Sequence, residues 1–398
     1  MAAEAAGAHP EGGARSEPEP SFTLERGSET SPRAGLLRTS HGVVRTPAFM
    51  PVGTAGSVKG LSPAEIRTAG TQILLSNTYH LMLRPGEDLI RRQGGLHRFM
   101  GWDGPILTDS GGYQILSLRE NVRLQEEGVE FRSHLDGHAE FLTPERAMAI
   151  QADLGVDVAV TLDHAILLPA TPEAVRDAGE RTLRWTERSL THAASLTTPT
   201  GLPQLKFAIV QGGGDPAMRA EMAARTGALP CDGFALGGLS VGEAKAETWA
   251  LARAANAALP ANRPRYLMGM GTPADLLDGI AAGVDLFDCV LPTRNARNGM
   301  AFTSEGTLNI RNAAHAEDAR SLDDRCRCEA CASFSRAYLR HLHQAGEILA
   351  HRMLTLHNVT FYQTLMREAR LAIERGDFDA FVEDFRRRYR ERPAAPIP

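Results

Sequence analysis

Eight short apolar runs recur along the chain with helical stretches between them. Each run is apolar at consecutive positions, which is typical of strands that are covered on both faces. The runs are AFMPV near 48, QILL near 72, PILT near 105, DVAVTL near 157, LKFAIV near 205, GFAL near 233, RYLMGM near 265 and VDLFDCV near 284. Alternation of such strands with helices predicts an α/β fold with a parallel (β/α)8 TIM barrel.

Helix starts are marked by a hydroxyl residue that precedes a proline. A hydroxyl cap with proline at the first helical position favours helix initiation, and an acidic residue follows shortly after each proline. The four capping residues are Ser62, Thr143, Thr171 and Thr272. The stretch from 171 to 197 has the apolar spacing of one long amphipathic helix.

Two regions depart from the alternation of strands and helices. Residues 126 to 143, between the third and fourth runs, have a hairpin-like pattern and look like an insertion. From about 300 a cysteine cluster precedes a long helical pattern. We therefore expect a disordered tail over 1–20, a catalytic barrel over 21–300, and a C-terminal zinc-binding helical subdomain packed on the barrel over 301–395.

Composition limits the location of the protein and the way it contacts partners. The formal net charge of the 398 residues is -5, so RNA binding would need a local basic patch on an acidic body. No apolar run is long enough to span a membrane, and the start of the chain lacks the features of a secretory signal. A cytoplasmic protein without a membrane span is expected.

Three cysteines fall within six residues, which is the spacing of a metal site rather than of a disulfide framework. They are Cys326, Cys328 and Cys331. Four histidines follow as candidates for a fourth ligand: His341, His343, His351 and His357. Three thiolates and one imidazole form the closed tetrahedral set of a structural zinc site, which leaves no position for a catalytic water.

Three aspartates stand at or directly after predicted strands, where barrel enzymes hold their catalytic groups. They are Asp109, Asp163 and Asp288. A carboxylate at a strand end often only caps the next helix, but convergence of three on one rim favours a site. Two carboxylates near one sugar carbon suit double displacement at a glycosidic bond. If a second base replaces water as acceptor, the same machinery is a transglycosylase.

Several motifs resemble those of the tRNA-guanine transglycosylases. They include FMPVGT (49 to 54), NTYHL (77 to 81), GWDGPILTDSGGYQ (101 to 114), SHLDG (133 to 137), FALGGLSVGE (234 to 243), YLMGMG (266 to 271), LFDCVLPTRNARNG (286 to 299), and CRCEAC followed by LTLHN. The resemblance is collinear from about 21 to about 390. It implies an irregular TIM barrel with a zinc subdomain, and a homodimer.

The resemblance also implies a reaction. Members exchange the wobble guanine of tRNAs with GUN anticodons, those for Asp, Asn, His and Tyr, for a 7-deazaguanine base in queuosine biosynthesis. Asp288 matches the nucleophile that attacks the ribose and forms a covalent intermediate. Asp109 matches the general acid and base, with holding of the Asn77 loop as its structural alternative.

Further roles follow from the same motifs. Base recognition falls to Asp163, Gln211, the backbone N–H of Gly238 and, around the side substituent, Leu239 and Glu243. Tyr113 and Met268 are expected to sandwich the base, since a flat heterocycle taken out of a stack needs stacking partners. Arg294 and Arg297 match residues that bind the anticodon loop, and LTLHN selects His357 as the fourth zinc ligand.

The chain departs from many bacterial members after the fourth strand. They have FDEC, whereas this chain has Leu162-Asp163-His164-Ala165. Ala165 replaces a cysteine beside the base's side substituent and adds room, while Val241 is retained. The accepted base is therefore open between 7-aminomethyl-7-deazaguanine, which Glu243 and the Leu239 backbone favour, and the bulkier queuine.

Three other functions make different predictions. A non-catalytic tRNA-binding subunit is expected to lack the nucleophile, but Asp288 is present. A zinc-dependent hydrolase predicts metal ligands spread over the barrel strands, whereas the cysteines are clustered. A retaining glycosidase predicts hydrolysis without an acceptor base and without dependence on an anticodon loop.

Overall fold

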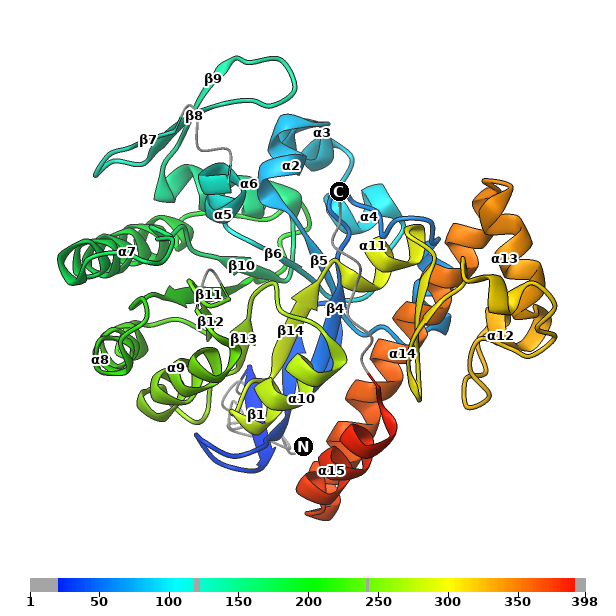
Figure 1. Ribbon diagram of the computed structural model, residues 1–398. Coiled ribbons are helices and arrows are strands. Elements are labelled where there is room, and N and C mark those ends of the chain that lie inside the picture. The colour runs from blue at the N-terminus through cyan, green and yellow to red at the C-terminus, as the bar shows by residue number, and fades with distance from the viewer. Residues whose placement is uncertain (1–20, 118–121, 241–242, 391–398) are drawn as a thin grey trace, which may run out of the picture.

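The computed structural model describes residues 21–117, 122–240 and 243–390. Eight parallel strands form its centre in the order β4-β14-β13-β12-β11-β10-β6-β5, and a parallel bridge between Val52 and Leu75 closes the barrel (Figure 1). The strands are β4 (Ala48–Pro51), β5 (Leu74–Ser76), β6 (Ile106–Thr108), β10 (Val158–Val160), β11 (Leu205–Val210), β12 (Gly233–Leu236), β13 (Arg265–Leu267) and β14 (Leu286–Cys289). The eight predicted strands and the TIM barrel are confirmed. The predicted tail over 1–20 and Val241 lie outside the described residues.

Helices surround the barrel. They are α1 (Pro63–Thr68), α2 (Thr78–Leu83), α3 (Glu87–Arg92), α4 (Leu96–Met100), α5 (Gly112–Ser117), α6 (Pro144–Leu154), α7 (Pro172–Ala193), α8 (Pro216–Gly227), α9 (Lys245–Ala258) and α10 (Pro273–Ala281). Ser62, Thr143, Thr171 and Thr272 each accept a hydrogen bond from a first-turn backbone N–H, so the predicted caps are confirmed.

An antiparallel sheet that the sequence pattern did not predict precedes the barrel. It comprises β1 (Phe22–Arg26), β2 (Ala34–Thr39) and β3 (Gly42–Thr46). Phe22, Leu37 and Val44 are buried in the same apolar cluster as Phe207 and Leu286 of the barrel strands. The sheet therefore covers the end of the barrel opposite the carboxyl ends of the strands.

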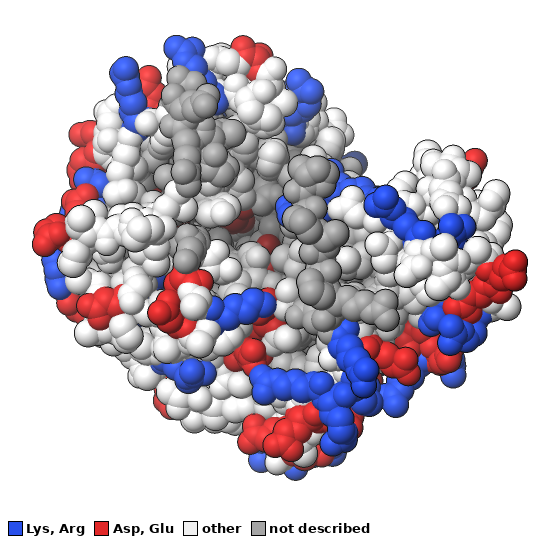
Figure 2. Space-filling view, viewed as in Figure 1, with Lys and Arg blue, Asp and Glu red and all other residues white. Residues whose placement is uncertain are grey.

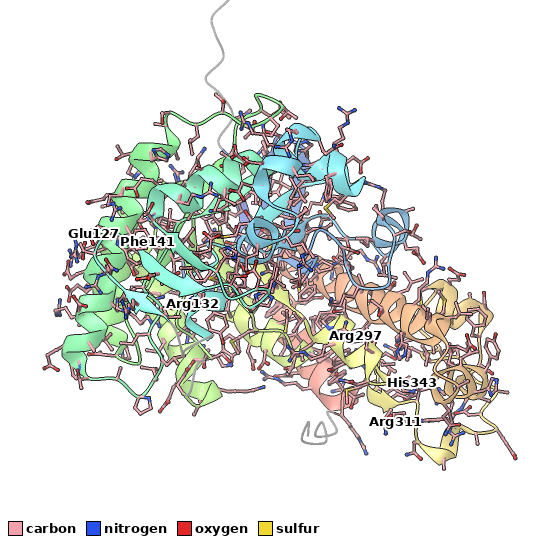
Figure 3. The ribbon with its side chains drawn as sticks, turned by 90° about the horizontal axis from the view of Figure 1, so that it is seen from above. Glu127, Arg132, Phe141, Arg297, Arg311 and His343 are labelled. Carbon is pink, nitrogen blue, oxygen red and sulfur yellow. The ribbon has the colours of Figure 1, made fainter. Side chains whose placement is uncertain are left out.

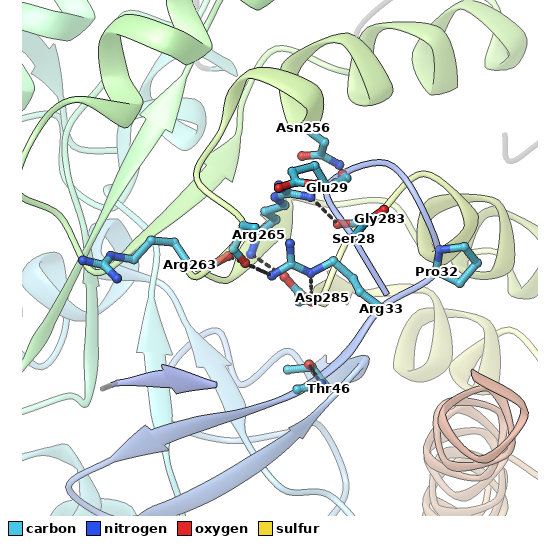
Figure 4. Close-up of polar contacts among 12 residues, drawn as sticks. Ser28, Glu29, Pro32, Arg33, Thr46, Asn256, Arg263, Arg265, Gly283 and Asp285 are labelled. Carbon is cyan, nitrogen blue, oxygen red and sulfur yellow. Dashed lines mark hydrogen bonds and ion pairs between the residues drawn. The ribbon is translucent and has the colours of Figure 1, made fainter. Parts of the chain in front are cut away.

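A buried ion pair ties this N-terminal segment to the last barrel strands (Figure 4). The Nε of Arg33 donates to Asp285 at 2.9 Å, and both side chains are fully buried. The second oxygen of Asp285 accepts from the backbone N–H of Arg265 at 2.8 Å. Burial nevertheless raises the pKa of Asp285 and lowers that of Arg265 to about 10.

The predicted insertion is a small antiparallel sheet that projects from the barrel (Figure 1). Its strands are β7 (Arg123–Leu124), β8 (Val129–Arg132) and β9 (Ala139–Leu142). The hairpin expected over 126 to 143 is present as β8 and β9, and β7 adds a short third strand before it.

The C-terminal region begins with α11 (Leu291–Arg297) and the hairpin of β15 (Met300–Thr303) and β16 (Gly306–Asn309). The elements that follow are the short 3₁₀ helix η1 (Ala313–His315), α12 (Glu329–Ser333), α13 (Arg336–Gln344), α14 (Ile348–Arg375) and α15 (Phe378–Arg388). The long helical pattern is two helices, because Gly346 has a φ of 73° that interrupts the run.

Helix α14 packs along the barrel and reaches its N-terminal sheet. Gln363 donates to the backbone carbonyl of Phe49 in β4, and Arg370 donates to the carbonyls of Gly35 and Thr46. Nearer its start, Asn358 donates to Pro292 and Met300 and accepts from Phe302. One helix therefore contacts α11, the β15–β16 hairpin, a barrel strand and the sheet below the barrel.

Candidate active site and metal centre

A cavity of about 390 Å³ lies at the carboxyl ends of the barrel strands and brings the three strand-end aspartates together. Asp109 comes from the end of β6, Asp163 follows β10, and Asp288 lies in β14. Each is largely buried, with 5%, 7% and 8% of its surface exposed. Three carboxylates in one buried cavity are costly unless they are held or used, which favours a catalytic site over three separate caps.

The two carboxylate oxygens of Asp288 differ in their hydrogen bonds. Its Oδ1 accepts from the hydroxyl of Tyr266 at 2.6 Å and from the backbone N–H of Gly269 at 2.8 Å. Among the described residues none donates to Oδ2. Burial raises the pKa of Asp288 to about 6, against the lowering effect of these two hydrogen bonds. The carboxylate is thus ionised at neutral pH with one unshared oxygen, as a nucleophile requires.

Asp109 is held more tightly than Asp288. Its carboxylate accepts from the side chains of Asn77 and Gln114, at 2.5 and 2.6 Å, and from the backbone N–H of Thr78 at 3.0 Å. Burial raises its pKa despite these donors. A carboxyl group whose pKa is raised by burial is suited to giving and taking a proton. The contacts also hold the Asn77 segment, so the catalytic and structural roles are compatible.

Asp163 pairs with Gln211, which follows β11. The Nε2 of Gln211 donates to Asp163 at 2.6 Å, and Ser110 contributes a longer contact at 3.4 Å. Burial raises the pKa of Asp163 to about 6, with the charge of Asp109 as a smaller contribution. The Oε1 of Gln211 is buried and has no partner among the described residues. Such a group is rare unless a ligand completes its bonding.

The loop after β12 borders the cavity with backbone rather than with side chains. Gly237, Gly238 and Leu239 line the cavity, and Gly238 has a φ of 60°. A Cβ on Gly238 would lie 2.6 Å from the Oε1 of Gln211, so glycine is required there. Glu243 does not line the cavity: its carboxylate accepts from the backbone N–H of Ser240 and from the Thr248 hydroxyl.

The two residues expected to sandwich the base, and the alanine that replaces the cysteine of many bacterial members, also lie at the cavity. Tyr113, Met268 and Ala165 line it, and Tyr113 is 55% exposed. A large exposed aromatic side chain at the mouth of a polar cavity is a ready platform for a flat ring.

Basic side chains lie beside the cavity on α11. Arg294 lines the cavity mouth, while Arg297 lies one turn further and donates to the carbonyl of Thr293. Figure 2 shows acidic atoms inside the central hollow and basic side chains along its border toward the C-terminal helices. Seen from above, Arg297, Arg311 and His343 lie on one side of the molecule and Arg132 of the inserted sheet lies on the other (Figure 3). Arg294 and Arg297 therefore give one side of the cavity a local positive charge on a chain whose net charge is -5.

The cysteine cluster forms a candidate metal centre on the C-terminal side of the barrel. Cys326, Cys328, Cys331 and His357 each direct one ligand atom into a space in which these atoms lie within 4.8 Å of one another. The Sγ of Cys331 lies 3.2 Å from the Nδ1 of His357, whose Nε2 donates to the carbonyl of Phe302 at 2.8 Å. That hydrogen bond leaves Nδ1 as the free ligand atom, which is the usual arrangement of metal-binding histidine. Of the four candidate histidines, His357 completes the set.

Comparisons with known proteins identify the family of the chain. The family described as queuine tRNA-ribosyltransferase matches residues 28–391. The chain belongs to this family. A queuine tRNA-ribosyltransferase of Methylobacillus flagellatus is 50% identical over 365 residues, which is 92% of this chain and 97% of the relative. Those of Aromatoleum aromaticum and Moorella thermoacetica are 51% and 48% identical, over 89% and 94% of this chain and 95% and 98% of the relatives.

Membership of the queuine tRNA-ribosyltransferase family makes the chain an enzyme, a pentosyltransferase. Within the parts of the chain that the structure describes, no helix combines the length and apolar character needed to cross a membrane.

Three groups of the candidate site were not predicted from the sequence. Tyr266 orients the proposed nucleophile, Gln114 binds Asp109, and Ser110 contacts Asp163. The signal for Gln114 and Ser110 was their place beside Asp109 in TDSGGYQ. Tyr266 begins the YLMGMG motif, but a tyrosine inside a strand is usually a core residue, so only the structure shows its contact with Asp288.

A second group of potential ligands is not a metal site. His41 and His97 both contact the buried Asp157, at 2.8 and 3.0 Å. Their rings stack with centroids 3.6 Å apart and an angle of 16° between planes. An ion bound by imidazole nitrogen lies near the ring plane, and two nearly parallel planes this far apart share no such position. The cluster joins the β2–β3 turn, α4 and the start of β10 below the barrel.

Proposed function

We propose that this enzyme exchanges the wobble guanine of tRNAs with GUN anticodons for a 7-deazaguanine base in queuosine biosynthesis. The observation that carries the proposal is the meeting of Asp288, Asp109 and Asp163 in one cavity at the carboxyl ends of the barrel strands. The names of the relatives supply the tRNA and the class of base. The tRNAs concerned are those for Asp, Asn, His and Tyr.

The reaction is a double displacement. The Oδ2 of Asp288 attacks the anomeric carbon while the bond to guanine breaks, which gives a ribosyl-aspartate intermediate. Asp109 gives its proton to the departing guanine and then takes one from the incoming base. The incoming base attacks the same carbon and releases Asp288. Two inversions retain the configuration of the sugar.

Asp163 and Gln211 bind the donor edge of the base, because a carboxylate and an unpartnered amide oxygen both accept hydrogen bonds. The backbone N–H of Gly238 donates to the base carbonyl. Tyr113 and Met268 sandwich the ring, which replaces the stacking that the base loses when it leaves the anticodon loop. Arg294 and Arg297 bind the phosphates and uridines around it.

The two candidate bases are 7-aminomethyl-7-deazaguanine and queuine. Ala165 widens the cavity beside the expected position of the side substituent. We propose that the aminomethyl base is preferred, since the Leu239 backbone lines the cavity and Glu243, which holds the next residue, adds a negative charge nearby.

The remaining assignments concern the frame around the site. We infer that Cys326, Cys328, Cys331 and His357 bind one structural zinc ion per subunit, since a closed set of three thiolates and one imidazole suits zinc. The zinc serves the fold and no chemical step passes through it. We further propose a cytoplasmic homodimer in which 21–300 form the catalytic barrel and 301–395 the zinc-binding subdomain with its C-terminal helices.

The decisive experiment mixes the purified protein with an unmodified GUN-anticodon tRNA and labelled guanine, queuine or the aminomethyl base. Wild type and the control variant Asp379→Asn, which changes an exposed aspartate on α15, should incorporate label. Asp288→Ala should not. Normal exchange by Asp288→Ala, or no incorporation of any base by wild type, overturns the proposal.

The same assay separates the rival functions. A retaining glycosidase would release guanine without an acceptor base, and a zinc-dependent hydrolase would lose its chemistry as soon as zinc is removed. A protein–RNA adduct that survives denaturation in wild type but not in Asp288→Ala would establish the covalent step.

A further inference from the structure

A fully buried arginine lies directly beneath the loop that borders the base cavity. Arg219 is on α8, and its guanidinium donates to four backbone carbonyls. The acceptors are Gly213 at 3.0 Å, Val210 at 3.3 Å, Gly237 at 2.6 Å and Gly238 at 2.7 Å. Burial lowers the pKa of Arg219 to about 10, so it stays charged at neutral pH.

The hydrogen bonds to Gly237 and Gly238 determine where the next two N–H groups point. In a planar trans peptide the C=O and the following N–H point in opposite directions. Because both carbonyls face Arg219, the N–H groups of Gly238 and Leu239 face away from it, toward the cavity that these residues line. Neither N–H donates to another described residue. Consecutive N–H groups that point into one concavity form a receptor for negative charge.

Among the described residues, no carboxylate forms an ion pair with Arg219. Its hydrogen bonds go to carbonyls, and Glu243, the acidic residue that acts on its pKa, accepts instead from the N–H of Ser240 and the hydroxyl of Thr248. A buried cation whose neighbours are only dipoles polarises those dipoles strongly, since the surrounding dielectric is low. Here the polarised groups are the two peptides whose N–H ends face the cavity.

We infer that Arg219 is a positioning residue that orients the N–H groups of Gly238 and Leu239 as a two-donor receptor for the base carbonyl and stabilises the charge that develops there. The inference rests on the proposed function. When the glycosidic bond breaks, its electron pair leaves with guanine and spreads through the ring onto the carbonyl oxygen. Asp288 forms the new bond to the sugar, and the proton from Asp109 neutralises the departing base. Donors fixed in advance at such an oxygen accelerate the step that charges it.

The test compares Arg219→Lys with Arg219→Gln, which both lose the guanidinium fork but differ in charge. Each is assayed for release of the wobble base from RNA that carries either guanine or 2,6-diaminopurine at that position; 2,6-diaminopurine has an amino group in place of the carbonyl. Removal of one such donor typically lowers kcat about 100-fold or more. We expect Arg219→Gln to lose about that factor in kcat with guanine, Arg219→Lys to lose less, and the KM for tRNA to change less than about threefold.

The matched control is Arg225→Gln, an exposed arginine on the same helix that pairs with Glu180. It should leave guanine exchange unchanged. With 2,6-diaminopurine as the departing base the two Arg219 variants should differ little from wild type, because that base has no carbonyl to stabilise. Equal losses with both bases, or equal losses in the Lys and Gln variants, would mean that Arg219 only supports the fold, and the inference fails.

Binding of the free bases separates this outcome from failure of the proposed function. Calorimetry with guanine and 2,6-diaminopurine needs no tRNA, so it reads the carbonyl receptor even if no exchange is found. Wild type should prefer guanine by at least about tenfold, and Arg219→Gln should lose most of that preference. No preference in wild type contradicts the inference.

Discussion

Replacement of Asp288 by asparagine should abolish base exchange and at the same time stabilise the fold at neutral pH. Burial raises the pKa of Asp288 from 3.8 to about 6, whereas the unfolded chain keeps the ordinary value. The folded state therefore holds this proton more tightly, and it loses stability as pH rises from about 4 to about 6. A pKa shift of about two units lowers the free energy of unfolding by about 3 kcal/mol at pH 8, and about 2 kcal/mol of this loss occurs above pH 4.5.

Asparagine is nearly isosteric and its Oδ1 still accepts from Tyr266 and Gly269, so the substitution removes the charge without leaving those donors unpaired. The gain of Asp288→Asn over wild type should therefore grow by about 2 kcal/mol between pH 4.5 and pH 8. For a chain of this size that is a Tm difference on the order of 2–3 °C. Urea unfolding and thermal melts at both pH values measure it, with the exposed Asp379→Asn as control. A difference in stability between Asp288→Asn and wild type that does not depend on pH refutes the assumption that burial penalises the ionised form of this carboxylate.

Three further outcomes are expected. Cys328→Ser should lower the bound zinc, measured by elemental analysis, and lower Tm, while exchange by the protein that remains folded persists. Gly238→Ala should reduce kcat at least about 100-fold, because its Cβ meets a buried amide at 2.6 Å and its φ is positive, whereas Gly214→Ala, with 3.5 Å of space, should be near wild type. Asp285→Ala should lower the free energy of unfolding by about 3–5 kcal/mol in urea, because Arg33 stays buried without its partner, and a loss under about 1 kcal/mol would contradict that view.

The barrel was predictable because its strands are buried on both faces. A strand of that kind appears as a continuous apolar run, which polar and helical segments on either side delimit clearly. The N-terminal sheet over 22–46 was missed for the opposite reason: its strands are partly exposed and carry mixed polar and apolar residues. The helix break at Gly346 had a visible signal in its glycine, but the apolar spacing on both sides outweighed it.

The candidate site was likewise predictable only in part from the sequence. Spacing alone located the cysteine cluster, and strand ends located Asp288 among three aspartates, since both depend on chain order. The residues that hold the site in place are brought to it only by folding, so chain order does not reveal them. Arg219 stands on an amphipathic helix, where an arginine is normally taken for a solvated side chain, and only the folded chain places four carbonyls around it.

Helix α14 sets a limit on how the chain can be divided. A fragment ending near residue 300 would expose the barrel surface beneath this helix and leave the carbonyls of Phe49, Gly35 and Thr46 without the donors Gln363 and Arg370. Such a fragment should aggregate rather than serve as a minimal catalyst. For expression, fusion or split-protein design, the barrel and the C-terminal region with the cysteine cluster therefore have to be kept together, although they are separate segments of the sequence.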